Sequence, residues 1–84
     1  MIEFCFDGVY YLGYCLSLGK AERSLLEVLA TYTDSVAAAE LAAKTGVAVG
    51  NLASTAKTIN HKTNVIGGRD VIEIERGCYR LLDG

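Results

Sequence analysis

The sequence predicts an α+β fold in which an N-terminal antiparallel hairpin or small sheet precedes three helices and a C-terminal β-hairpin. Three observations predict it. Residues that favour β-strands surround Asp7-Gly8, apolar residues then recur at helical spacing from Lys20 to Lys62, and strand-favouring residues return around Arg76-Gly77. The 84 residues can enclose one modest hydrophobic core, so we expect a single domain spanning residues 1–84.

Composition narrows the class of protein. Hydrophobic residues make up 51% of the chain, which is too many for a disordered tail, yet the apolar runs are far shorter than the ~20 residues that cross a bilayer. The first residues lack the basic and apolar blocks of a secretory signal, so we expect a cytoplasmic protein without membrane contact. The cysteines are odd in number and form no Cys-x-x-Cys pair, which predicts buried free thiols and argues against a disulfide framework and a zinc site: Cys5, Cys15 and Cys78. We expect no metal and no cofactor.

The N-terminal hairpin is predicted from the turn-forming pair Asp7-Gly8 between two strand-favouring runs. A two-residue turn at this pair would set the cross-strand neighbours, which are Phe6 with Val9 and Phe4 with Tyr11. Residues 14–18 are predicted to add a short third strand. One face of this hairpin is apolar and must be covered by the rest of the chain.

Helical periodicity predicts three helices in the middle of the chain. The first spans about residues 21–32, where apolar residues recur every three or four positions. Asp34-Ser35 is a candidate N-cap for the second helix, which spans residues 36–45 and ends at Gly46, where a positive φ is least costly. The third helix spans about residues 49–62.

The third predicted helix has two different sides. At 100° per residue, one side carries residues spaced four, three and four apart and is expected to face the core: Leu52, Ala56, Ile59 and Thr63. The opposite side is polar and basic and carries no acid: Ser54, Lys57, Thr58 and His61, flanked by Asn51, Thr55 and Lys62. The third helix is therefore expected to expose a cationic surface.

The run from Glu40 to Thr55 is the most informative segment of the chain. A helix-turn-helix needs a small residue where its helices cross, a glycine in the turn four residues later, and an apolar residue six positions further on. These three requirements are met by Ala42, Gly46 and Leu52. The run indicates a helix-turn-helix and favours contact with double-stranded DNA.

The distribution of charge supports the same interpretation. The net charge is −2, but the segment from Leu41 to Arg69 contains no acid and carries four bases, while the remainder holds four bases and ten acids. Affinity for nucleic acid depends on the local cationic surface and on the counterions that it displaces. The sequence therefore favours DNA binding by this segment, and a solvated helix face without a partner is the alternative.

The side chains of the third helix have the chemistry of base recognition. Lysine donates to guanine O6 and N7 or to phosphate, asparagine pairs with adenine, and Ser, Thr and His contact bases or backbone. We expect a major-groove contact by Ser54, Lys57, Thr58 and His61, with Asn51 and Thr55 beside them, and phosphate contacts by Lys62, Arg69 and Arg76. His61 could instead be a surface residue without a role.

A second hairpin is predicted about the turn Arg76-Gly77. Its expected cross-strand pairs are Ile74 with Tyr79, Ile72 with Leu81 and Glu73 with Arg80. Arg76 at the tip could reach a phosphate or a narrow minor groove, and the alternative is a turn without any contact. Both Glu73 and Glu75 alternate with the isoleucines, so they would point away from DNA or weaken its binding.

The order of these elements, together with two motifs, resembles the winged helix-turn-helix effector domain of OmpR/PhoB-type transcriptional regulators. Residues Leu18, Glu22, Leu25 and Leu26 match the start of the first helix in that family. The family's Arg-Gly-x-Gly-Tyr-Arg-Leu ending is matched, with one residue missing, by Arg76, Gly77, Tyr79, Arg80 and Leu81. The resemblance spans nearly the whole chain and implies a transcription regulator in which the C-terminal hairpin is the wing.

Several residues depart from the family pattern. Gly19 stands where a threonine cap is usual, and Ser54, Thr58 and Asn60 stand where basic or larger residues are expected. These departures imply low affinity or a need for a homodimer. No receiver domain is present, which implies a free-standing regulator.

Two other classes of function are alternatives to DNA binding. An enzyme is not expected, because one His allows no Ser-His-Asp or Cys-His site and no Gly-rich phosphate loop follows a strand. A winged-helix adaptor or inhibitor that binds a protein partner is the serious alternative, because an acidic chain with a lightly charged third helix suits protein as well as DNA. The expected partners are therefore double-stranded DNA and a second copy of the chain, with a protein partner as the alternative.

Overall fold

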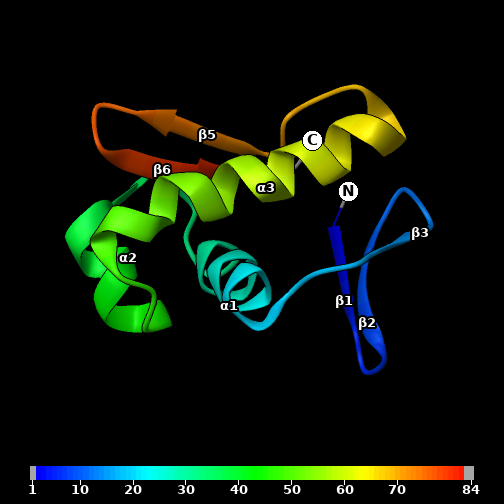
Figure 1. Ribbon diagram of the computed structural model, residues 1–84, viewed down its shortest axis with the longest axis horizontal. Coiled ribbons are helices and arrows are strands. Elements are labelled where there is room, and N and C mark those ends of the chain that lie inside the picture. Colours follow the sequence, from blue (N-terminus) through cyan, green and yellow to red (C-terminus); the bar gives the residue numbers. More distant parts are fainter. Residues whose placement is uncertain (1, 83–84) are drawn as a thin grey trace.

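The computed structural model describes residues 2–82 as three helices and two small three-stranded antiparallel sheets (Figure 1). The strands are ordered β1-β2-β3 in one sheet and β4-β6-β5 in the other. Buried apolar side chains from both sheets and all three helices form one core cluster. This α+β arrangement is compatible with a small winged-helix-like fold. Within the described residues, none of the helices has the length and apolar character needed to span a membrane.

The first sheet consists of β1 (Ile2–Cys5), β2 (Gly8–Tyr11) and β3 (Tyr14–Leu16). The predicted third strand is confirmed, but the predicted register of the first hairpin is wrong by two residues: Ile2 pairs with Tyr11 and Phe4 with Val9. A shift of two residues keeps the same side chains on the inner face. It brings Ile2 into the core and leaves Phe6 in the turn with 94% of its surface exposed.

The expectation of buried thiols is also wrong. Cys5 and Cys15 are exposed, and Cys78 is half-buried. Neighbouring residues in a strand point to opposite faces. Leu16 and Tyr79 face the core, so Cys15 and Cys78 beside them point outward.

Helix α1 (Lys20–Leu29) covers the core with Leu25, Leu26 and Leu29, all of which are buried. It begins after Gly19, whose backbone N–H donates a hydrogen bond of 3.0 Å to Oε1 of Glu22. This contact satisfies the N–H of the capping residue, as the glutamate of a capping box does. The helix ends three residues before the predicted end.

The segment after α1 differs from the prediction. Asp34-Ser35 does not cap the second helix, because Val36 and Ala37 form a short strand, β4 (Val36–Ala37), and α2 (Ala38–Thr45) starts after it. Val36 pairs with Tyr79 of the C-terminal hairpin, and both side chains are buried. Burial of a β-branched residue against a strand outweighs the helical preference of the alanine run. The predicted end is confirmed at Gly46, which has a φ of +77° and donates its N–H to the Ala42 carbonyl at 2.9 Å.

Helix α3 (Val49–Gly67) has 19 residues and begins where the sequence predicts. It continues five residues beyond the predicted Lys62, and Gly68 with a φ of +72° caps it. The predicted core side is confirmed, since its members are all buried: Leu52, Ala56, Ile59 and Thr63. Close packing at the end favours Gly67, because a Cβ there would approach Leu12 Cδ1 to 2.9 Å and the side chain of buried Tyr11 to 3.0 Å.

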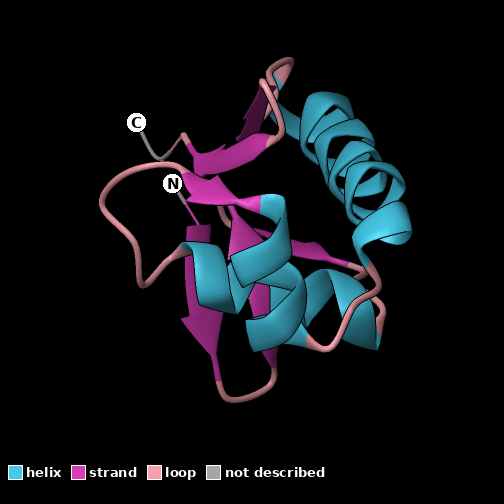
Figure 2. Ribbon diagram, turned by 90° about the vertical axis from the view of Figure 1, so that its left-hand side faces the viewer, coloured by secondary structure: helices cyan, strands magenta, loops and turns pink. Residues whose placement is uncertain are grey.

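The second sheet joins β4 to the hairpin of β5 (Ile72–Glu75) and β6 (Cys78–Leu81). The predicted register is confirmed at every pair, including Ile74 with Tyr79 and Glu73 with Arg80. Arg76 and Gly77 both have positive φ, +53° and +76°, as a two-residue type I′ turn requires. Figure 2 shows α3 along one side of the molecule with strands of this sheet beside it.

Candidate nucleic-acid interface

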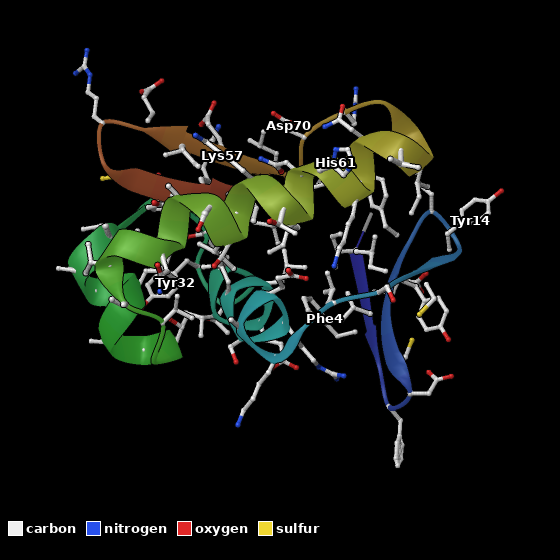
Figure 3. The ribbon with its side chains drawn as sticks, in the orientation of Figure 1. Phe4, Tyr14, Tyr32, Lys57, His61 and Asp70 are labelled. Carbon is white, nitrogen blue, oxygen red and sulfur yellow. The ribbon has the colours of Figure 1, made fainter. Side chains whose placement is uncertain are left out.

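The most exposed polar surface of α3 consists of Ser54, Lys57, Thr58 and His61, which we call the polar face. All four side chains are exposed, as expected, because the residues on the other side of the helix are buried. Figure 3 shows Lys57 and His61 on the same side of α3. Within residues 2–82 the ion pairs are Arg23–Glu27, Lys62–Glu22 and Arg80–Glu73, so no carboxylate neutralises Lys57 or His61 at close range.

Hydroxyl groups on and beside the polar face are bonded back to the helix. Thr55 Oγ1 and Ser54 Oγ donate to the Asn51 carbonyl at 2.8 and 3.1 Å, and Thr58 Oγ1 donates to the Ser54 carbonyl at 3.0 Å. The hydroxyl protons are thus engaged, while the oxygen lone pairs stay free to accept. The donors that point outward from this surface belong to Lys57, His61 and the amide of Asn51, which is also exposed. Thr55 is half-buried.

Lys62 does not share this surface. Its Nζ lies 2.7 Å from Glu22 Oε1, and it also donates to the Ser17 carbonyl. These contacts join α3 to the start of α1 and engage two of the three ammonium N–H groups, so a phosphate contact by Lys62 would compete with them. Among the described residues, the bases of the acid-free segment without an ion-pair partner are Lys44, Lys57 and Arg69, and Lys44 lies beside Tyr32.

The ion pair with Lys62 also affects the pKa of the Glu22 carboxyl group. Burial by itself would raise the pKa of Glu22, but the hydrogen bonds from Lys62 and from the Gly19 N–H favour the ionised form. Their combined effect holds the pKa of Glu22 below its ordinary value. Glu22 therefore stays charged at neutral pH and keeps Lys62 in place.

The two predicted arginines lie at opposite ends of β5. Arg76 is exposed in the turn at the hairpin tip, whereas Arg69 is exposed in the connection between α3 and β5. Asp70 follows Arg69, and its carboxylate accepts a hydrogen bond from the Asn64 amide at the end of α3. The positive surface is therefore weaker towards the C-terminal end of α3 than at Lys57.

Acidic side chains of the hairpin gather on a different surface. Glu73 pairs with Arg80 at 3.1 Å, and both side chains alternate with buried Ile72 and Tyr79. They line an open groove of about 500 Å³ on the outer side of the second sheet, together with Glu75 and Asp34. Arg76 lines the same groove, so the glutamates lie off the polar face but beside the hairpin tip.

Sequence reasoning missed the role of Asn60. Its side chain is only 9% exposed, and it binds the backbone of Val71 and Ile72 with three hydrogen bonds. A spacing signal existed, because Asn60 lies four residues after Ala56 and three before Thr63, both of which face the core. Its polar character suggested the opposite, solvent-facing side.

No model of a known protein family matches this chain, and neither a characterised protein nor a solved structure matches it. Among the described residues, no group of three His, Cys, Asp or Glu side chains could hold a metal ion.

Proposed function

We propose that this chain is a sequence-specific regulator that binds double-stranded DNA through a winged helix-turn-helix. The observation that carries the proposal is the polar face of α3, four exposed side chains centred on Lys57 with no carboxylate partner among the described residues. In this proposal α3 enters the major groove, which is about 12 Å wide and admits one helix. Transcription is the process that we expect it to control.

The connection between α2 and α3 supports a helix-turn-helix. Gly46 ends α2 in the left-handed conformation, and α3 begins three residues later at Val49. Leu52 is fully buried and packs α3 into the core that α2 shares through Leu41. A helix held in this way presents its outer side as a rigid surface, which base recognition needs.

The hairpin beside α3 supports a wing. In the arrangement that we propose, Arg76 at its tip contacts a phosphate or the minor groove next to the major groove that α3 occupies. The match of residues 76–81 to the ending of OmpR/PhoB-type effector domains supports membership of that class. We propose a binding role for this surface and no catalytic one.

The modest charge of the interface limits the affinity that we propose. With Lys62 paired to Glu22, few bases remain to displace counterions from DNA. A single module also contacts few base pairs, and homodimers place two recognition helices about 34 Å apart on two half-sites. We therefore propose that two copies bind one operator, which size-exclusion chromatography with and without duplex would test.

The experiment is a titration of labelled duplex DNA, both random and from the chain's own upstream region, at several salt concentrations. We expect affinity to fall steeply with salt, and Lys57→Ala to weaken binding and lower the slope of log K against log salt by about 0.9. Lys20→Ala is the matched control, because it removes an exposed charge from α1, outside the helix pair. Equal effects of the two substitutions would contradict the proposal.

A protein-binding module is the second candidate, and one observation favours it. Large apolar side chains are exposed around the first sheet and the end of α3: Phe6, Leu12, Tyr14 and Val65. Such side chains are common at protein interfaces. If the chain were an adaptor or inhibitor, duplex binding would be absent at low salt and substitution of Phe6 or Val65 would abolish binding to the partner.

A further inference from the structure

The contact between Asn60 and β5 resembles the pairing of two strands. Asn60 Nδ2 donates to the Ile72 carbonyl at 2.9 Å, and Asn60 Oδ1 accepts the N–H groups of Ile72 and Val71 at 2.9 and 3.0 Å. Because β5 is at the edge of its sheet, the amide takes the place of a neighbouring strand. Asn60 thereby satisfies backbone groups that would otherwise be buried without partners.

These bonds hold α3 at one rotation about its own axis. Asn60 lies three residues after Lys57 and one before His61, so the direction of its side chain fixes the direction of theirs. An apolar residue at this position could slide along β5, whereas hydrogen bonds to Ile72 define one position. The rotation of the polar face relative to the sheet therefore depends on Asn60.

The hydrogen bonds from Asn60 also attach the β5–β6 hairpin to α3. β5 runs from Ile72 to Glu75 and leads directly into Arg76. Figure 1 shows the β5–β6 hairpin alongside α3, with its turn near the end where α3 begins. One side chain thus connects the polar face to the strand that carries the hairpin tip.

We propose that Asn60 is a positioning residue that fixes α3 and the hairpin in one relative orientation, so that the polar face and Arg76 engage the same DNA duplex together. This inference rests on the proposed function. Asn60 itself contacts no DNA, because its side chain is buried. Its effect on binding is exerted through Arg76.

The test is a double-mutant cycle on the full chain, with a random-sequence duplex of about 20 base pairs, or two helical turns, as the probe. Asn60→Asp keeps the size of the side chain, and its ionised carboxylate cannot donate to the Ile72 carbonyl. Affinities are measured by fluorescence anisotropy for the wild type, Arg76→Ala, Asn60→Asp and the double variant. Circular dichroism establishes that each variant is folded.

We expect Arg76→Ala to weaken binding about fivefold in the wild-type background and less than about twofold in the Asn60→Asp background. Lys57→Ala, on α3 itself, is the matched control and should weaken binding by the same factor in both backgrounds. A residue with only a structural role would change stability and leave the Arg76 factor unaltered. If Arg76→Ala weakens binding by the same factor in both backgrounds, the inference about Asn60 is overturned. The proposed function still stands in that case, provided that the wild type binds duplex DNA.

Failure of the wild type to bind any duplex would overturn the proposed function and this inference with it. If Asn60→Asp does not fold, Asn60→Ser takes its place, because its shorter side chain removes the amide bonds to β5 without adding a charge to the core. Residual dipolar couplings of this variant, measured without DNA, report the angle between α3 and β5. A changed angle supports the positioning role, and an unchanged angle overturns it.

Discussion

Lys62 and Glu22, forty residues apart in the chain, form an ion pair of 2.7 Å that joins α3 to the first turn of α1. The pair is partly buried, with side-chain exposures of 30% and 18%. Lys62 also binds the Ser17 carbonyl, so a single ammonium group connects α3, α1 and the segment between β3 and α1. This lysine acts in the stability of the fold, although the sequence suggested a phosphate contact.

Replacing Lys62 should lower stability and leave DNA binding nearly unchanged. We expect Lys62→Ala to reduce the free energy of unfolding by about 1 kcal/mol, at the upper end for a partly exposed ion pair. Lys57→Ala, which removes an exposed lysine with no ion-pair partner among residues 2–82, should change it by less than about 0.5 kcal/mol. Urea denaturation of both variants measures the difference. A larger loss of stability for Lys57→Ala would contradict this assignment.

The ion pair should also make stability depend on pH in the acid range. Because the pKa of Glu22 is lowered in the folded protein, its contribution is fully present above the unfolded value of about 4.3 and is lost as the pH falls through the folded value. Urea unfolding between about pH 3 and pH 6 should show this loss in the wild type. In Lys62→Met the dependence should be shallower, and a parallel pH profile for the two proteins would refute the account.

Two glycines, one at the end of α2 and one in the first turn of α3, should respond to alanine in opposite ways. Gly46 has a φ of +77°, so Gly46→Ala should lower the free energy of unfolding by about 1 kcal/mol. Gly50 lies in the first turn of α3 with open space around it, and Gly50→Ala should raise stability by up to about 1 kcal/mol. Thermal denaturation followed by circular dichroism separates the two, and stabilisation by Gly46→Ala would mean that α2 ends differently.

The three thiols should differ in reactivity. Cys5 and Cys15 lie exposed on the first sheet, whereas Cys78 is half-buried on β6. When the native protein is treated with a thiol reagent, two thiols should therefore be modified quickly and the third more slowly, because solvent access limits the reaction. Mass spectrometry of the quenched reaction identifies the modified residues. Three equally slow sites would show that the first sheet is covered in solution.

The C-terminal hairpin and the two sides of α3 could be predicted from the sequence because short-range patterns determine them. Alternation around Ile72 and Ile74 and the positive-φ turn at Arg76-Gly77 set the strand register. The spacing of Leu52 and Ile59 likewise sets the inner side of α3. In these elements local preference and burial agree.

The remaining features depend on partners distant in the chain. Two residues are too few to show a strand period, so Val36 could be placed only through its partner Tyr79. Lys62 and Asn60 looked like solvent-facing polar residues because Glu22 and Ile72 are far from them in sequence. The polar face could be predicted, and the contacts that orient it could not.

The most direct test of the account is a titration of ¹⁵N-labelled protein with duplex DNA at low salt, followed by two-dimensional NMR. We expect the largest shifts at the polar face and at the hairpin tip, so at Lys57, His61 and Arg76, with little change at Phe6 or Tyr14. Shifts confined to the first sheet, or no shifts at any DNA concentration, would contradict DNA binding by α3.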